Sequence, residues 1–135
     1  MTGRAQELLD SNVLIYAFTT DPRAETAERL LAKGCYVSLQ GLNEFANVAR
    51  RKLLMSWMEI EDALANIRVL CRSVLPMDLD THSQAIELAK RYELSFYDAL
   101  MIAAALRGGC TVLWSEDMHD GLVIDSRLRI QNPFK

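Results

Sequence analysis

Residues 8–18 read LLDSNVLIYAF, and this stretch decides how the chain begins to fold. Its two leucines form the end of a short apolar strand, and Asp10 follows them directly. Ser11 and Asn12 come next, polar residues that the interior of a sheet would exclude, and an apolar segment with helical character follows. Because residues 4–7 are polar, we expect only a short strand, then a turn at Asp10 and a helix.

Strand and helix signals alternate outward from this stretch. The Asp-Pro pair at residues 21–22 is expected to open a helix, with Asp as its cap and Pro in its first position, and Gly34 is expected to end it. Residues 35–39 form a compact apolar strand candidate. From Leu42 onward, apolar residues recur at helical spacing, which places Glu44 in the first turn of the next helix.

Two further helix starts are predicted from capping boxes, in which a Ser or Thr cap exchanges hydrogen bonds with a residue three positions later. Ser56 with Glu59 forms the first box, and Thr81 with Gln84 forms the second. The apolar residues 74–77 lie between the two helices and predict a strand.

The last third of the chain completes the alternation. Ser95 is expected to cap a helix that Gly108 ends, followed by a strand at residues 111–114 and an edge strand at residues 128–130. Strands that alternate with helices form right-handed crossovers and a parallel sheet. We therefore expect one α/β domain over residues 1–135, with a mainly parallel central sheet flanked by helices on both faces.

Four acids stand where an apolar run gives way to a turn or a new helix. Asp10 ends the first strand, Glu44 opens the helix after the second, and Asp117 follows the fourth. The helix of Asp98 must finish at the amino edge to feed the strand at residues 111–114, so it begins at the carboxyl edge. Ligands bind at this edge of a parallel α/β sheet, and all four acids are predicted to meet there.

Carboxylate oxygens without a Cys or His ligand set suit Mg²⁺ or Mn²⁺ rather than zinc. The acids also have structural interpretations, because Asp98 and Glu44 each lie in a predicted first helical turn, where a negative charge stabilises the helix. On the loop of Asp117, Glu116 and Asp120 are further candidate ligands, and the sequence leaves the choice open.

Composition limits the possible partners and compartments. The formal net charge of −3 and the pI of about 5.4 give no uniformly basic face for nucleic acid, so a nucleic-acid enzyme would need metal, a local basic patch or a second subunit. Residues 50–52, Arg-Arg-Lys, are either a solvated helix face or a phosphate contact. Three widely spaced cysteines suggest neither disulfides nor a metal clip.

The sequence also gives no sign of a membrane or export signal. The longest apolar stretch, residues 99–106, is far shorter than the roughly 20 residues that span a bilayer. The first residues lack the basic, apolar and small-residue pattern of a signal peptide. We therefore expect a cytoplasmic protein that does not contact membranes.

Four segments together resemble PIN-domain ribonucleases of the VapC-like toxin family. The segments are LLDSNVLIYAF (8–18), SLQGLNEFANVARRK (38–52), LSFYDALMIAAALRGGC (94–110) and VLWSEDMHDG (112–121). They follow one another in the family's order and continue to the closing RIQNPF, so the likeness extends over almost the whole chain.

The resemblance implies an endoribonuclease that depends on Mg²⁺ or Mn²⁺ and hydrolyses RNA phosphodiester bonds. It implies that four acids form the catalytic, metal-binding cluster: Asp10, Glu44, Asp98 and Asp117. Asn12 and Ser115 match the polar positions that support this cluster. Residues 118–120, Met-His-Asp, depart from the commoner continuation, which leaves the identity of the loop ligand open.

The resemblance also implies partners. It points to a homodimer that is the toxin of a toxin–antitoxin pair and is inhibited by a cognate antitoxin protein. The apolar residues near Trp57 are candidates for the subunit contact.

Two other classes of protein remain as alternatives. A non-catalytic PIN-like module that binds RNA or protein would be expected to lose one or more acids, whereas all four positions are filled. A phosphoacceptor signalling domain also carries acids at the carboxyl edge, but it needs a Lys at the end of a late strand. The lysines of this chain lie elsewhere in the predicted order: Lys33, Lys52, Lys90 and Lys135.

Overall fold

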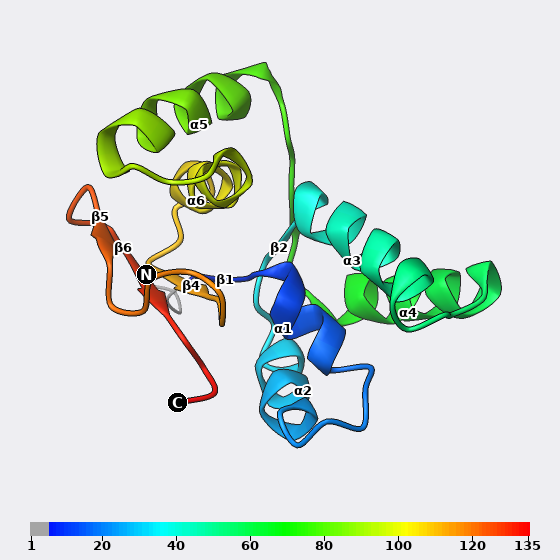
Figure 1. The fold of residues 1–135 in the computed structure, drawn as a ribbon. Coiled ribbons are helices and arrows are strands. Elements are labelled where there is room, and N and C mark those ends of the chain that lie inside the picture. The colour runs from blue at the N-terminus through cyan, green and yellow to red at the C-terminus, as the bar shows by residue number, and fades with distance from the viewer. Residues whose placement is uncertain (1–5) are drawn as a thin grey trace.

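The computed structural model describes residues 6–135, and its strands and helices alternate as predicted (Figure 1). Residues 4 and 5 of the polar segment before the first strand lie outside the described part. The elements are β1 (Glu7–Leu9), α1 (Ser11–Tyr16), α2 (Ala24–Ala32), β2 (Val37–Ser38), α3 (Leu39–Arg51), α4 (Trp57–Leu70), β3 (Val74–Leu75), α5 (Leu79–Tyr92), α6 (Phe96–Arg107), β4 (Val112–Trp114), β5 (Val123–Ile124) and β6 (Leu128–Gln131).

The strands form a mainly parallel sheet. The larger part has the order β1-β4-β6-β5, in which only the β5–β6 pair is antiparallel. The parallel pair β2–β3 continues it beyond β1. Tyr36 makes the connection, because its backbone oxygen accepts from the Leu9 amide at 3.0 Å and its amide donates to the Glu7 oxygen at 2.7 Å. The α/β prediction is therefore confirmed.

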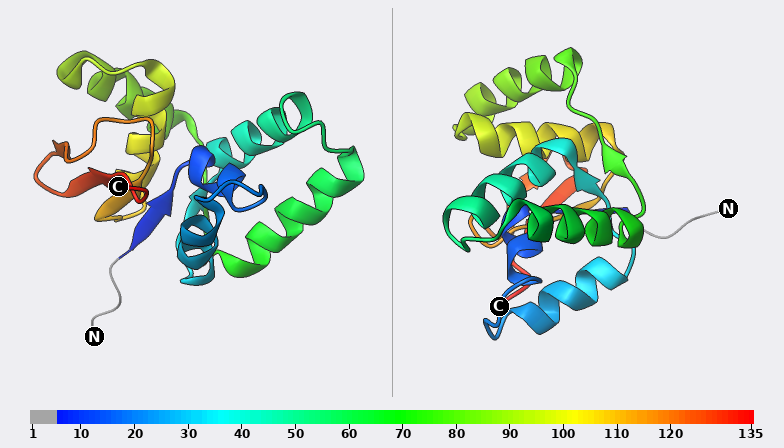
Figure 2. Two further views of the ribbon diagram at one scale, coloured as in Figure 1. Left: turned by 60° about the horizontal axis from the view of Figure 1, so that its bottom comes forward. Right: turned by 90° about the vertical axis from the view of Figure 1, so that its right-hand side faces the viewer.

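Helices cover both faces of this sheet. Neighbouring residues of a strand point to opposite faces, so Leu8 packs with α5 and α6 while Leu9 packs with α1 to α4. Figure 1 shows α5 and α6 together on one side of the strands, with α1 and α2 on the other. In Figure 2, α3 and α4 extend from the body as an arm of two helices.

Helix α6 lies between α5 and the sheet, which explains the longest apolar stretch of the sequence. Eight consecutive residues, from Ala99 to Leu106, are buried. A helix that is apolar all round is buried on all sides. Within residues 6–135, no helix combines the length and apolar character that crossing a membrane requires. Cys35, Cys71 and Cys110 are free thiols, in agreement with the expected lack of disulfides.

Two of the predicted caps are confirmed. Ser56 and Glu59 form the full capping box of α4, and the Ser95 hydroxyl accepts from the Asp98 amide at the start of α6. The box predicted for Thr81 and Gln84 is wrong, because α5 begins three residues earlier, with Asp78 as its cap in place of Thr81.

Two other helix starts also differ from the predictions. Helix α3 begins at Leu39 with Ser38 as its cap, so Glu44 lies in the second turn and not the first. Helix α2 begins at Ala24 rather than at Pro22. Asp21 accepts from the Arg23 amide at 2.8 Å and so stabilises a turn before the helix.

The predicted edge strand at residues 128–130 is not at the edge. It is β6 and lies between β4 and β5, while β5 forms the edge. Strand β5 was not predicted, because the turn that joins it to β6 uses Asp125 and Ser126 at positive φ, 51° and 56°, where glycine or asparagine is the usual signal. Strands β2 and β3 are also shorter than predicted, with two residues each.

Glu93, which ends α5, provides a test of local strain. Its φ of 55° is a left-handed conformation that favours glycine, and its side chain is exposed. We expect Glu93→Gly to raise the free energy of unfolding by about 1 kcal/mol, measured by urea denaturation. Glu61→Gly, at an exposed position inside α4, should lower it by about 1 kcal/mol. Equal changes in the two variants would contradict the assignment of strain.

Candidate active site

Asp10 stands at the centre of the carboxyl edge. It follows β1 and caps α1, and its side chain is only 6% exposed. One carboxylate oxygen accepts from the Ser11 amide and the other from the Ser115 hydroxyl, both at 2.7 Å. Ser115 follows β4, the hydrogen-bonded neighbour of β1, so strand pairing brings together residues that are far apart in sequence.

This environment makes the charged form of Asp10 costly. Burial raises the pKa of the Asp10 carboxyl to about 6, and the hydrogen bonds from Ser115 and Ser11 offset only part of that rise. The nearby carboxylates of Glu44 and Asp98 raise the pKa further. A cation placed among these groups would reverse the effect, because positive charge favours the ionised form.

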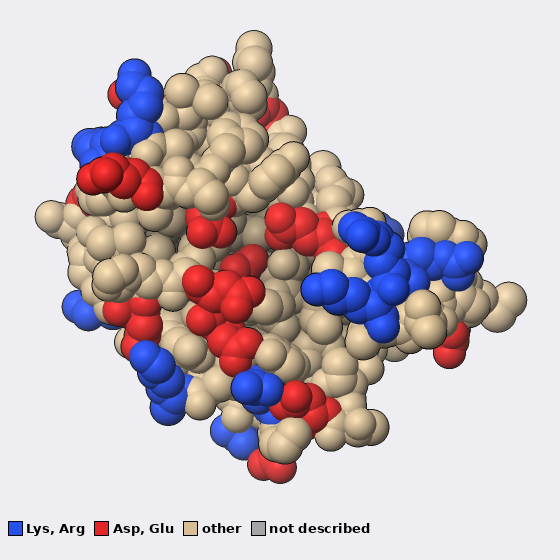
Figure 3. Space-filling view, in the orientation of Figure 1, with Lys and Arg blue, Asp and Glu red and all other residues tan. Residues whose placement is uncertain are grey.

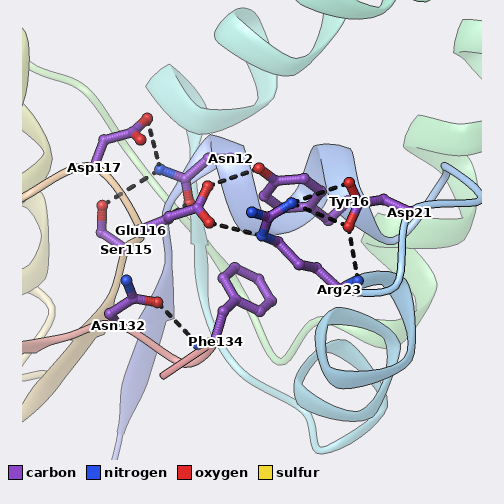
Figure 4. Close-up of polar contacts among 9 residues, drawn as sticks. All are labelled: Asn12, Tyr16, Asp21, Arg23, Ser115, Glu116, Asp117, Asn132 and Phe134. Carbon is purple, nitrogen blue, oxygen red and sulfur yellow. Dashed lines mark hydrogen bonds and ion pairs between the residues drawn. The ribbon is translucent and has the colours of Figure 1, made fainter.

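Asn12 connects the turn after β1 to the loop after β4. Its amide nitrogen donates to Asp117 at 3.2 Å and to the Ser115 hydroxyl at 3.4 Å (Figure 4). The same nitrogen donates to Asp10 at 3.4 Å. Its amide oxygen accepts from the Glu116 backbone at 3.3 Å. Asn12 therefore fixes the position of Asp117 relative to Asp10.

Helices α3 and α6 supply the other two acids. The Ser11 hydroxyl donates to Glu44 at 3.0 Å, and the Gln40 amide donates to the other Glu44 oxygen at 3.3 Å. All four predicted acids line one pocket of about 350 Å³, together with Ser11, Asn12, Asn47 and Val48. Figure 3 shows acidic side chains gathered around a hollow near the middle of one face. The placement of the acids at one edge is thus as predicted.

The four acids line the walls of this pocket, but their carboxylates are too far apart to form a complete coordination sphere around one ion. Within residues 6–135, no three His, Cys, Asp or Glu side chains are grouped closely enough to hold an ion. The chemistry of the pocket nevertheless fits a hard divalent cation. Its donors are carboxylate, hydroxyl and amide oxygens, and one carboxylate is buried and costly to ionise without a positive partner.

The other two acids of the Asp117 loop are held by different groups. Glu116 accepts from the Tyr16 hydroxyl at 2.7 Å and pairs with Arg23 at 2.9 Å (Figure 4). The Asp120 carboxylate accepts a hydrogen bond from the backbone N–H of Asn132 at 2.8 Å. Asp117 is therefore the loop acid that faces the pocket. The roles of Tyr16 and Arg23 were missed by sequence reasoning, because no spacing connects them to Glu116.

The basic residues at the end of α3 separate into two groups. Arg50 donates to the Met55 backbone oxygen at 3.0 Å and lies over the Trp57 ring. Lys52 lines a second pocket of about 320 Å³ that it shares with Tyr16 and Asp117. Figure 3 shows Lys and Arg gathered over the arm of α3 and α4, next to the acidic hollow. Helix α3 therefore lines both the acidic pocket and this second pocket.

Comparisons with known proteins agree with this geometry. The family model for the PIN domain matches residues 8–119. A search of curated proteins gave no match. Among solved structures, the chain is similar to VapC20 of Mycobacterium tuberculosis, a sarcin-ricin loop cleaving toxin, with 24% identity and a TM-score of 0.67 over 83% of this chain and 90% of that one.

Two further structures share the fold at lower identity. A toxin–antitoxin complex from Klebsiella pneumoniae has 18% identity and a TM-score of 0.72 over 95% of this chain and 98% of that one. VapBC2 of Rickettsia felis, bound to a DNA fragment from its promoter, has 18% identity and a TM-score of 0.68 over 93% and 97%. Because the family match extends over most of the sequence, from the first strand to the loop after β4, the chain belongs to the PIN domain family.

Proposed function

We propose that this protein is a metal-dependent endoribonuclease that hydrolyses RNA phosphodiester bonds. The observation that carries the proposal is the pocket in which Asp10, Glu44, Asp98 and Asp117 meet at the carboxyl edge of a PIN domain. A buried carboxylate with a raised pKa, in a pocket with three further acids, is typical of a functional site.

Asp10, Asp98 and Asp117 would hold Mg²⁺ or Mn²⁺, and Glu44 would bind a second ion or orient the attacking water. A bound divalent ion lowers the pKa of a coordinated water and neutralises charge on the scissile phosphate. The side chains of the pocket then have to position the ion and orient the attacking water, and none of them needs to act as the nucleophile. Attack by water predicts products with 5′-phosphate and 3′-hydroxyl ends, whereas attack by the ribose hydroxyl would leave a cyclic phosphate.

Ser115 and Asn12 would act as positioning residues for the acids. The Ser115 hydroxyl holds Asp10, and the Asn12 amide spans Asp10 and Asp117. Lys52, at the rim beside Asp117, is placed to contact an RNA phosphate and so offset the acidity of the pocket.

Asn12→Ala is expected to raise the Mg²⁺ concentration needed for half-maximal cleavage by about 10- to 100-fold, the usual effect of losing a residue that orients metal ligands. The cleavage rate should be measured as a function of Mg²⁺. Asn66→Ala, at an exposed position on α4, is the matched control and should leave the Mg²⁺ dependence unchanged. An unchanged dependence in Asn12→Ala would contradict the positioning role.

The proposed activity is tested by incubating purified protein with total cellular RNA in Mg²⁺, in Mn²⁺ or with a chelator, and by mapping the ends of any fragments. Cleavage that depends on the added ion and leaves 5′-phosphates supports the proposal. Binding of RNA without cleavage, from protein free of any co-purified inhibitor, would support the non-catalytic module instead.

We also propose that the protein is the toxin of a toxin–antitoxin pair and acts in the cytoplasm as a homodimer. Structures similar to it include a toxin–antitoxin complex, which supports an antitoxin protein as partner. Exposed apolar side chains on the arm support a subunit contact: Leu54 is 80% exposed, Trp57 60% and Met58 71%. Sedimentation that shows only monomer would contradict the dimer, and growth unaffected by expression of the protein would contradict the toxin.

A further inference from the structure

A polar pocket adjoins the acidic one. It has a volume of about 330 Å³ and is lined by Gln40, Asn43, Glu44, Asn47 and Tyr97. Glu44 and Asn47 line both pockets, so the two form one continuous surface. Gln40 also holds Glu44, but nothing in the proposed hydrolysis uses the amides of Asn43 and Asn47 or the ring of Tyr97.

One face of α3 supplies the amides. Gln40, Asn43 and Asn47 are spaced by three and four residues, so they lie above one another along the helix. Asn43 and Asn47 are exposed, and neither side-chain amide makes a hydrogen bond to any residue in the range 6–135. An amide presents a donor beside an acceptor, the arrangement that pairs with the polar edge of a nucleobase.

Tyr97 supplies an aromatic ring to the same pocket. It is 62% exposed, although burial is the usual preference of so large a ring. Its ring packs edge-on against half-buried Phe96, with ring centroids 5.6 Å apart, which supports it from behind. An exposed ring in an RNA-binding groove is a platform on which a base can stack.

The charges of this pocket favour a base over a phosphate. Its lining includes the Glu44 carboxylate and no Lys or Arg, so a phosphate placed there would be repelled. Phosphates are better placed at Lys52, on the other side of Asp117. Because Tyr97 directly precedes Asp98 in the chain, a base on its ring belongs to a nucleotide near the scissile phosphate.

We propose that Gln40, Asn43, Asn47 and Tyr97 form a nucleobase subsite for single-stranded RNA. The base stacks on Tyr97 and its polar edge is read by the amides of α3. The position of this subsite next to the cut rests on the proposed nuclease function. The subsite deepens that function, because it selects which unpaired base lies beside the scissile phosphate. Only an unpaired base can enter it, because both the face and the pairing edge of the base are used.

Binding is tested with short single-stranded RNAs that carry 2-aminopurine, a base whose fluorescence is quenched by stacking. The protein is the Asp10→Asn variant, so that the RNA stays intact. In this Asp10→Asn background, the further substitution Tyr97→Leu should weaken RNA binding by about 5- to 150-fold and abolish the quenching. Tyr97→Phe in the same background should retain both the binding and the quenching. Val69→Ala, which trims another exposed apolar side chain, on α4, is the control and should bind like its parent.

Base reading is tested by mapping the cut sites of otherwise wild-type enzyme on a pool of random single-stranded RNA. Asn43→Ala and Asn47→Ala should relax the base preference at one position next to the cut, and Asn66→Ala on α4 should not. Equal binding and quenching in the Tyr97→Leu and Val69→Ala variants, with cleavage intact in the wild type, would overturn the subsite and leave the nuclease proposal standing. Binding lost in Tyr97→Leu, without cleavage by the wild type, would uphold the subsite and overturn the nuclease.

Discussion

Asp10→Asn is expected to lower the rate of RNA cleavage by about 10³-fold, because several kcal/mol of transition-state stabilisation depend on the metal that Asp10 would hold. The substitution removes the negative charge and keeps the shape. The asparagine oxygen can still accept from the Ser11 amide, and its nitrogen can donate to the Ser115 hydroxyl in place of the bond that Ser115 now donates. The variant should therefore fold normally, and the loss reports on the chemistry.

The measurement is the single-turnover cleavage rate at saturating Mg²⁺, with circular dichroism to confirm the fold. Asp120→Asn is the matched control, because Asp120 lies on the same loop as Asp117 but accepts from the Asn132 amide instead of lining the pocket. It should cleave at close to the wild-type rate. A wild-type rate in Asp10→Asn would remove Asp10 from the catalytic cluster.

The same substitution is expected to stabilise the metal-free protein near neutral pH, by about 2–3 kcal/mol. The pKa of Asp10 is about 6 in the folded state and 3.8 without the influence of the fold. Between these values the folded state binds more protons than the unfolded state. The free energy of unfolding of the wild type therefore falls as the pH rises through this range and stays lower above it.

Urea denaturation in the presence of a chelator measures this difference. The free energies of wild type and Asp10→Asn should coincide below about pH 4, where Asp10 is protonated in both states. They should diverge as the pH rises from about 4 to about 6 and differ by a constant amount above that. Added Mg²⁺ should stabilise the wild type and leave the variant unchanged. Asp62→Asn, on the exposed surface of α4, should show no such divergence. A variant less stable than the wild type at neutral pH would show that the hydrogen bonds of the carboxylate outweigh its burial.

The sequence was sufficient to locate the edge at which the acids meet. A parallel α/β topology sends every strand end and the following helix start to the same side, so Asp10, Glu44, Asp98 and Asp117 could be placed together without side-chain detail. The position of Glu44 was right even though α3 begins earlier than predicted. The helix has the same direction whichever residue caps it.

The choice among the three loop acids could not be made from sequence. It depends on Arg23 and Tyr16 for Glu116 and on the Asn132 amide for Asp120, and these partners lie many residues away. The missed helix starts have a local cause. Asp78 and Thr81 are both acceptable cap residues. In the structure the Asp78 carboxylate accepts from the amide and the hydroxyl of Thr81, so Thr81 lies inside the helix.

The pairing of β1 with β4 has a consequence for the timing of synthesis. Asp10 and Ser115 are separated by 105 positions, so a ribosome needs about 5–20 s to make the second after the first. A nascent chain in which Asp10 and Glu44 have already been synthesised still lacks β4 and Ser115, which hold Asp10 in place. Fragments released by early termination before Ser115 therefore carry Asp10, Glu44 and Asp98 without the hydroxyl that holds Asp10 in the pocket.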